Sequence, residues 1–309
     1  MSVVTAAVVQ SGSFLFDTPK SLELLEAKTR EAAEAGAQLV VFPEAFIGGY
    51  PKGNHFGAPV GSRDEQGREW FRRYHQSAIT VPGIETQRIE KLCGELKVDL
   101  VVGAIERGST ATLYCSVLAF STDGKLIGKR RKLIPTAAER IIWGQGDGST
   151  LSTFDATCGK LCGVICWENF MPSLRMSQYA QGAEFYCAPT VDDRPTWTAL
   201  IQTIAMEGRC FVLSANQFMT RAHVPDDFDT VQGSDDETVL INGGSVIVSP
   251  LGTILSGPHF GSEAILYADL DKSELTRSKM DFDVAGHYSR PDIFRLHIDQ
   301  SKKPGVEFE

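Results

Sequence analysis

VVTAAVV (residues 3–9), TPKSLELLEAKTREAAEAG (residues 18–36) and QLVVF (residues 38–42) are the stretches that decide the fold class. The first and third are apolar runs rich in valine, which is typical of strands buried on both faces. The middle stretch repeats leucine and alanine along one face of a helix, and Gly36 is suited to closing that helix. The sequence therefore predicts a strand, a helix and a second strand in succession, the unit from which α/β folds are built.

The same alternation continues along the rest of the chain. Turns are expected at residues 123–124 and 250–252, where Asp-Gly and Pro-Leu-Gly separate apolar runs. Hydrophobic periodicity predicts further helices at residues 65–79, 85–97, 173–181 and 195–208. Runs rich in β-branched and apolar residues predict further strands at residues 98–105, 113–121, from 126 onward, 161–166, 184–188, 211–216, 245–249 and 264–270.

The chain shows no internal repeat and no Pro-rich or Ser-rich linker, so we expect one domain over residues 1–309. Residues 281–309 are expected to form a C-terminal tail of that domain. Residues 221–242 are polar, acidic and without periodicity, and loops of this length are usually functional or mobile. A mobile surface loop and a lid or assembly element are both open for this segment.

Composition excludes several classes of partner. The formal net charge is −9, which argues against nucleic acid or an anionic membrane as the main partner, because both require a basic face. No apolar run approaches the roughly 20 residues of a membrane-spanning helix, and the first residues lack the features of a secretory signal. The seven cysteines are odd in number and lie mostly in apolar segments. A reduced protein in the cytoplasm is therefore expected.

Three polar residues come directly after, or at the end of, predicted strands. Glu44 follows residues 38–42, Lys132 ends the strand that begins near residue 126, and Cys166 closes residues 161–166. Because ligands bind beyond the carboxyl ends of strands in α/β sheets, these side chains are expected to meet in one pocket if their strands are neighbours.

Each residue suits a role in thiol chemistry. Cys166 is the candidate nucleophile, and a cation such as Lys132 or the N-terminus of the following helix would help to remove its proton. A carboxylate behind an apolar strand, as Glu44 is, would have a raised pKa that suits proton transfer. Strand alternation places Lys132 opposite Arg131, so Lys132 is expected to point inward alone while the rest of the basic run stays solvated. The alternative interpretation is that Cys166 is an ordinary core residue and that Glu44 and Lys132 are solvated charges.

The sequence offers weaker support to three other kinds of site. Cys158, Cys162 and Cys166 recur every four residues, but zinc sites usually pair cysteines more closely, so no metal is expected. His259 and His287 follow Cys166 in the order of a thiol protease, yet neither lies in a recognisable catalytic segment. The glycines of residues 144–148 follow no strand and lack the Lys-Ser/Thr of a phosphate loop, so they indicate a turn.

The motifs around these residues resemble the nitrilase branch of the carbon–nitrogen hydrolase superfamily. The resemblance covers nearly the whole chain in the expected order. Trp-Glu-Asn after Cys166 is similar to true nitrilases, and FIGGYP (residues 46–51) is similar to the plant-type subgroup. The segments that carry it are VFPEAFIGGYP (41–51), KRRKLIPTAAERIIWGQGDGS (129–149), VICWENFMPSLR (164–175), YCAPT (186–190), FVLSANQF (211–218), GGSVIVSPLGTIL (243–255) and DFDVAGHYSRPD (281–292).

The resemblance implies a catalytic triad of Glu44, Lys132 and Cys166, with Glu139 as a second active-site glutamate. It also implies an αββα sandwich, pairing into an αββα–αββα homodimer that many members extend into spirals. The implied reaction is hydrolysis of a nitrile to a carboxylic acid and ammonia through a covalent intermediate on the cysteine, with no metal or organic cofactor. Arylaliphatic or cyano-amino-acid nitriles are the implied substrates.

Two other functions remain open at this point. An amidase or carbamoylase would use the same triad, and a catalytically silent binding protein could share the fold. Tyr50, Trp167, Pro189 and Thr190 follow predicted strand ends and are candidates for shaping the acyl side of the pocket, although each could equally be packing.

Overall fold

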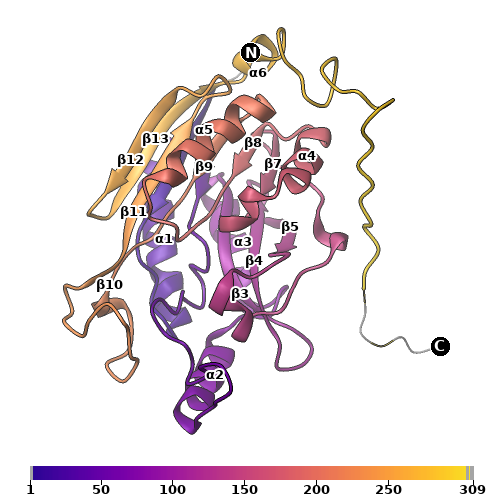
Figure 1. Cartoon of the computed structure of the whole chain (residues 1–309). Helices are drawn as coiled ribbons and strands as arrows, with labels where there is room; N and C mark the ends of the chain where they lie inside the picture. Colours follow the sequence, from indigo (N-terminus) through magenta and orange to yellow (C-terminus); the bar gives the residue numbers. More distant parts are fainter. Residues whose placement is uncertain (1–2, 304–305, 307–309) are drawn as a thin grey trace.

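The computed structural model describes residues 3–303 and residue 306. Two β-sheets form the centre of this part of the chain (Figure 1). Within the described residues, the first sheet has six strands in the order β13-β1-β2-β3-β4-β5. Their bounds are β1 Val3–Gln10, β2 Leu39–Val41, β3 Asp99–Arg107, β4 Leu113–Ser121, β5 Lys125–Arg131 and β13 Ala264–Asp271.

The second sheet has seven strands in the described residues. Six run in the order β10-β11-β9-β8-β7-β6, and β12 pairs with β11 off this path. Their bounds are β6 Phe154–Asp155, β7 Lys160–Gly163, β8 Phe185–Cys187, β9 Phe211–Ser214, β10 Phe218–Thr220, β11 Val239–Val248 and β12 Ile254–Phe260.

Helices cover the outer faces of both sheets. Leu22 and Leu25 of α1 (Thr18–Glu34) and Leu92 of α3 (Ile84–Leu96) pack on the first sheet. Leu174 of α4 (Pro172–Ala180) and Ile201 of α5 (Thr196–Gly208) pack on the second, and Figure 1 shows both helices lying over it. The remaining helical segments are α2 Glu65–Ser77, α6 Ser273–Ser278, η1 Ala137–Ile141, η2 Gly148–Thr150, η3 Cys166–Phe170 and η4 Arg221–His223.

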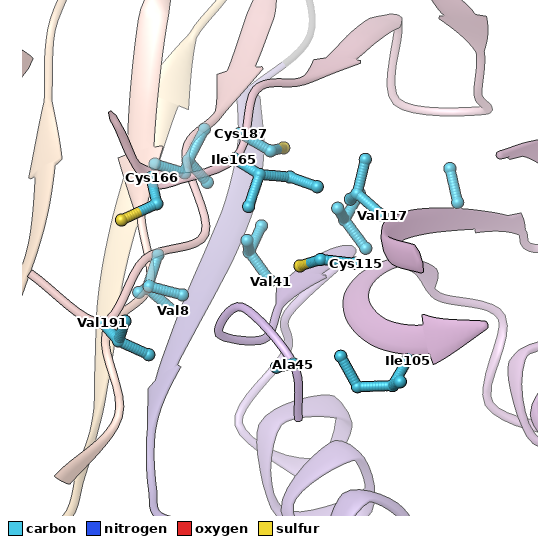
Figure 2. Close-up of a cluster of buried hydrophobic side chains, with 14 of the residues drawn as sticks. Val8, Val41, Ala45, Ile105, Cys115, Val117, Ile165, Cys166, Cys187 and Val191 are labelled. Carbon is cyan, nitrogen blue, oxygen red and sulfur yellow. The ribbon is translucent and has the colours of Figure 1, made fainter. Parts of the chain in front are cut away.

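A third apolar layer lies between the two sheets. Val8, Val41 and Val117 of the first sheet pack there against Cys187 of β8 and against Ile165, which follows β7, as Figure 2 shows. Apolar side chains on both faces of each sheet explain why the central strands read as continuous apolar runs rather than alternating ones. The layers are therefore helix, sheet, sheet and helix, which confirms the predicted αββα sandwich.

Strand direction determines where the site can form. β2 runs parallel to β1 and β3, and β5 returns to the same direction because both the β3–β4 and β4–β5 pairs are antiparallel. In the second sheet β7, β8 and β9 are parallel. The loops after β2 and β5 therefore leave the first sheet at the same edge. Contrary to the supposition made from the sequence, these strands are not neighbours, because β3 and β4 lie between β2 and β5, and Cys166 follows β7 of the second sheet.

The structure also corrects several boundaries. The predicted strand at residues 161–166 ends at Gly163, and Cys166 instead begins η3. The predicted loop at residues 221–242 contains η4 and the first residues of β11, so its aperiodic part is shorter than expected. The strands β6, β10 and β12 were not predicted, whereas the turn at residues 250–252 connects β11 to β12 as expected.

After α6 the described chain contains no further helix or strand. Residues 281–303 run along the outside of the sandwich (Figure 1). The last part of the predicted tail, residues 304–305 and 307–309, lies outside the described residues. None of the helices described here has the length and apolar character needed to cross a membrane.

Candidate active site

Glu44 is buried three residues after the end of β2. Its side chain is fully shielded from solvent, and its backbone carbonyl accepts a hydrogen bond from Gln217 Nε2 at 2.8 Å. The following residue, Ala45, has a φ of 52°, so the chain turns sharply at the carboxylate. Gly103 of β3 permits this turn, because a Cβ there would lie 2.5 Å from the backbone of Pro43 and Ala45. The backbone therefore fixes Glu44 just beyond the carboxyl end of β2.

Lys132 is the first residue after β5, and it bridges two carboxylates. Its Nζ lies 2.7 Å from Glu44 Oε1 and 2.7 Å from Glu139 Oε2, and its side chain is fully buried. Burial opposes the positive charge, but Glu44, Cys166 and Glu139 outweigh that effect and hold the pKa of Lys132 well above its usual range. The lysine is therefore a fixed cation between two acids.

Glu139 is held by the short helix η1. Its Oε2 also accepts a hydrogen bond from the backbone N–H of Thr136 at 2.6 Å, and its Oε1 accepts one from the Tyr50 hydroxyl at 2.8 Å. Ala137, inside this turn, has a φ of 47°. Glu139 thus shares Lys132 with Glu44 and is oriented by Tyr50, so the second glutamate lies at the site as the resemblance implied.

Cys166 begins η3 with a φ of 51°, in the left-handed region that non-glycine residues rarely occupy. Such a conformation costs roughly 1–3 kcal/mol and persists only where its surroundings enforce it. Here the Cys166 N–H donates to Pro189 O at 2.9 Å, and Asn169 Nδ2 donates to Cys166 O at 2.8 Å. The Thr190 hydroxyl donates to the sulfur at 3.3 Å. The turn therefore holds the sulfur in a defined place.

The two candidate proton-transfer groups have shifted pKa values. Burial raises the pKa of Glu44 to about 7, against the lowering effect of Lys132. Burial and the charge of Glu44 raise the pKa of the Cys166 thiol far above its usual value, although Lys132 and Thr190 act in the opposite direction. Lys132 thus lowers the pKa of the Cys166 thiol, in the direction expected, but burial and the charge of Glu44 outweigh this effect in the resting site. Cys166 rests as a thiol beside a carboxyl that titrates near neutrality.

A cavity of about 410 Å³ opens onto Cys166. Glu44 and Lys132 lie behind the sulfur and are fully buried, whereas Trp167 is 41% exposed and forms part of the wall. The Trp167 indole donates to Asp192 Oδ2 at 2.9 Å. The cavity is lined by residues 50–56, 136–139, 141–143, 166–167 and 191–194. Its wall combines aromatic side chains, among them Tyr50, Trp143 and Trp167, with the charged side chains of Glu139, Asp192 and Arg194.

A family model described as carbon–nitrogen hydrolase matches residues 5–280 of the chain. The chain belongs to this family. It is 54% identical over 301 residues to a nitrilase of Bradyrhizobium diazoefficiens, which covers 97% of this chain and 94% of that protein. It is 51% identical to a bifunctional nitrilase/nitrile hydratase of Lupinus angustifolius, which covers 99% of this chain and 88% of that protein. These relatives confirm the predicted nitrilase branch.

Solved structures of the carbon–nitrogen hydrolase family share the fold. Nit3 of Saccharomyces cerevisiae superposes with a TM-score of 0.72 at 23% identity, covering 93% of this chain and 97% of that one. An amidase from Nesterenkonia sp. gives a TM-score of 0.64 at 19% identity, covering 90% and 94%. At these identities the likeness shows the sandwich architecture alone.

In this carbon–nitrogen hydrolase, the structure brings together the four residues singled out as catalytic candidates. Tyr50 and Trp167 also line the cavity. Pro189 and Thr190 are not among the lining residues, and instead contact the backbone and sulfur of Cys166. The structure describes no group of three or more side chains that could hold a metal ion.

A second buried ion pair, not predicted from the sequence, lies next to the candidate triad. The guanidinium of Arg130 contacts both carboxylate oxygens of Glu168, and neither side chain is exposed to solvent. Glu168 also accepts hydrogen bonds from the backbone N–H groups of Leu133 at 2.6 Å and Ile165 at 3.1 Å. One carboxylate therefore ties the chain beside Lys132 to the chain beside Cys166.

The expectation that Lys132 alone of the basic run points inward is wrong. Arg130 and Lys132 are two residues apart, so strand alternation places both on the inner face. Lys129 and Arg131, on the other face, both pair with Glu106, at 2.6 Å in each case. The signal was present in the sequence as the even spacing of two basic residues within a predicted strand.

Proposed function

We propose that this protein is a nitrilase that converts an organic nitrile and two waters into a carboxylic acid and ammonia at Cys166. The observation that carries the proposal is the buried arrangement of one ammonium between two carboxylates, 2.7 Å from each, behind a thiol that opens onto a cavity. The nitrilase names of relatives about 50% identical over nearly the full length support the same reaction.

In the first step the Cys166 sulfur attacks the nitrile carbon, and Glu44 accepts the thiol proton. Because burial holds the resting thiol protonated, the sulfur and its base must act together. The proton passes to the nitrile nitrogen as the carbon–sulfur bond forms, which gives a neutral thioimidate. Lys132 and the backbone N–H of Trp167 stabilise the negative charge that develops on nitrogen.

In the second step a water molecule adds to the thioimidate carbon and gives a tetrahedral intermediate. Glu44 takes a proton from this water, and Glu139, on the other side of Lys132, supports the charge balance of the site. Protonated nitrogen leaves as ammonia, so that a thioester remains on Cys166. A second water then releases the carboxylic acid and returns the thiol. If sulfur leaves before nitrogen, the product is the amide, and a minor amide product is therefore expected.

The cavity wall supports a substrate with an aromatic group. Tyr50, Phe56, Trp143 and Trp167 surround the space in front of the sulfur and offer flat apolar surface at little cost in side-chain entropy. We therefore favour arylaliphatic nitriles over cyano-amino acids as substrates of this site.

We also propose that residues 1–309 act as one domain and that the protein works as a homodimer or a larger spiral. All seven cysteines are buried and unpaired, which supports a reducing compartment, and we propose the cytoplasm.

The test is a panel of nitriles and their matching amides, with ammonia, acid and amide measured as products. We expect the wild-type protein to release ammonia and acid from arylaliphatic nitriles faster than from the amides. Cys166→Ala should abolish turnover while leaving the circular dichroism spectrum unchanged. A strong preference for amides would identify an amidase, and turnover by Cys166→Ala would disprove the proposed nucleophile.

A further inference from the structure

A second thiol lies against the catalytic carboxylate. The Sγ of Cys115, on β4, is 3.7 Å from Glu44 Oε1, and both side chains are buried. Figure 2 shows Cys166 at one edge of the cluster between the sheets and Cys115 inside the cluster, near Val41 in this view. The steps proposed above use only one of these two sulfurs.

Cys115 contacts both charged members of the candidate triad. Its thiol faces Glu44, and its backbone carbonyl accepts the N–H of Lys132 at 2.8 Å. β4 is paired on both sides, with β3 and with β5, so the backbone of Cys115 is held in the middle of the sheet. A residue held in this way can fix the relative position of a carboxylate and an ammonium.

The hydrogen bonds of Glu44 show what this contact does. Oε1 accepts from Lys132 Nζ at 2.7 Å and lies within reach of the Cys115 thiol, whereas Oε2 is buried with no hydrogen-bond partner among the described residues. Oε2 is thus the oxygen that remains free to take a proton. We propose, on the basis of the function proposed above, that Cys115 is a positioning residue that holds Glu44 by Oε1 and thereby leaves Oε2 for the Cys166 proton.

The chemistry of the Cys115 thiol fits this role. Burial and the charge of Glu44 raise its pKa well above its usual range, against the effect of Lys132, so the group stays protonated and can donate to the carboxylate. A thiol is a weak donor, and a donor to a carboxylate favours the charged form of that carboxylate. Cys115 therefore makes Glu44 a carboxylate at lower pH than it would otherwise be.

The experiment measures the pH dependence of kcat/KM in the full-length protein, using a nitrile that the wild type hydrolyses. Cys115→Ala removes the donor, and we expect the acidic limb of the profile to move to higher pH by about 0.5 unit, as expected for one weak hydrogen bond. Cys115→Ser retains a donor, and its limb should lie closer to that of the wild type. The position of the limb does not depend on how much of the protein is folded.

Cys187→Ala is the matched control. Cys187 is also fully buried in the cluster between the sheets and its removal deletes the same atoms, but among the described residues its thiol makes no hydrogen bond to Glu44, whereas the Cys115 thiol lies 3.7 Å from Glu44 Oε1. Its limb should coincide with that of the wild type. If Cys115→Ala also leaves the limb in place, or if Cys187→Ala moves it equally, Cys115 is packing only and the inference is wrong.

The proposed function has a separate readout. Turnover by Cys166→Ala would remove the proposed nucleophile, whatever the Cys115 variants do. Loss of activity in Cys166→Ala and Glu44→Gln, together with an unmoved limb in Cys115→Ala, would leave the function standing and overturn only the role of Cys115.

Discussion

The buried Arg130–Glu168 pair provides a quantitative test of how the site is held together. Glu168→Gln keeps nearly the same shape but leaves the Arg130 guanidinium in the core without a counter-charge. The backbone N–H groups of Leu133 and Ile165 donate to the two oxygens of Glu168. The N–H₂ of a glutamine cannot accept such a hydrogen bond, so one of the two donors would also lose its partner. Removing one partner of a buried pair typically costs about 3–5 kcal/mol, so we expect a loss of that size.

Urea unfolding measures this loss. With a slope of roughly 3 kcal/mol/M for a chain of this size, the midpoint should fall by about 1–1.7 M. Ammonia release and circular dichroism should be followed together, because coincident transitions support a two-state reading. Asp292→Asn, which breaks the exposed pair with Arg290, is the control and should leave the midpoint unchanged.

The double variant Arg130→Met/Glu168→Leu separates charge from shape. An apolar pair of similar volume should be less destabilising than Glu168→Gln, because no uncompensated charge remains in the core. It should nevertheless lose activity, since nothing then ties Leu133 to Ile165. A free energy of unfolding for Glu168→Gln within about 0.5 kcal/mol of the wild type would show that solvent reaches Arg130, and would refute the reasoning.

Four further outcomes follow from the geometry of the site. Burial raises the pKa of Glu44 to about 7, and only its carboxylate form accepts a proton. A pH profile of kcat/KM should therefore fall about tenfold per pH unit at pH values well below 7. Glu44→Gln should lower kcat by about 10²–10⁴ and abolish this limb; retention of the limb would assign it to another group. Tyr50→Phe removes the hydrogen bond to Glu139, and steady-state kinetics should show a kcat lower by about three- to tenfold. An unchanged kcat would mean that Lys132 and Thr136 orient Glu139 without Tyr50. Thr190→Val removes the hydrogen-bond donor that lowers the pKa of Cys166, so iodoacetamide labelling of Cys166 at fixed pH should slow by about three- to tenfold. Faster labelling would contradict the lowering of the Cys166 pKa by Thr190.

The sequence predicted the main architecture because the central strands carry their own signal. Continuous valine-rich runs followed by polar residues indicated both the buried sheets and the three residues Glu44, Lys132 and Cys166, but not that Cys166 follows a strand of the second sheet. The left-handed turn at Cys166 was not predicted, since it depends on hydrogen bonds from Asn169 and to Pro189 rather than on glycine. A strand that simply ends at a cysteine and a strand that turns there have the same apolar pattern.

Long-range charge pairing was the other feature hidden from the sequence. Arg130 and Glu168 are 38 positions apart, and each stands next to a residue with a more obvious chemical role. β12 was missed because its exposed and half-buried residues give no apolar run, although its partner β11 does. Such elements are determined by their neighbours in space, and propensity along the chain does not report on those neighbours.

The placement of the triad has a consequence for how the molecule acquires activity. Glu44 and Lys132 follow strands of one sheet, and Cys166 follows a strand of the other. A folding intermediate that has completed either half of the sandwich on its own thus has an incomplete set of reacting groups and turns over nothing. During refolding, the return of ammonia release marks the moment when the two halves dock, later than any signal that reports only the formation of strands.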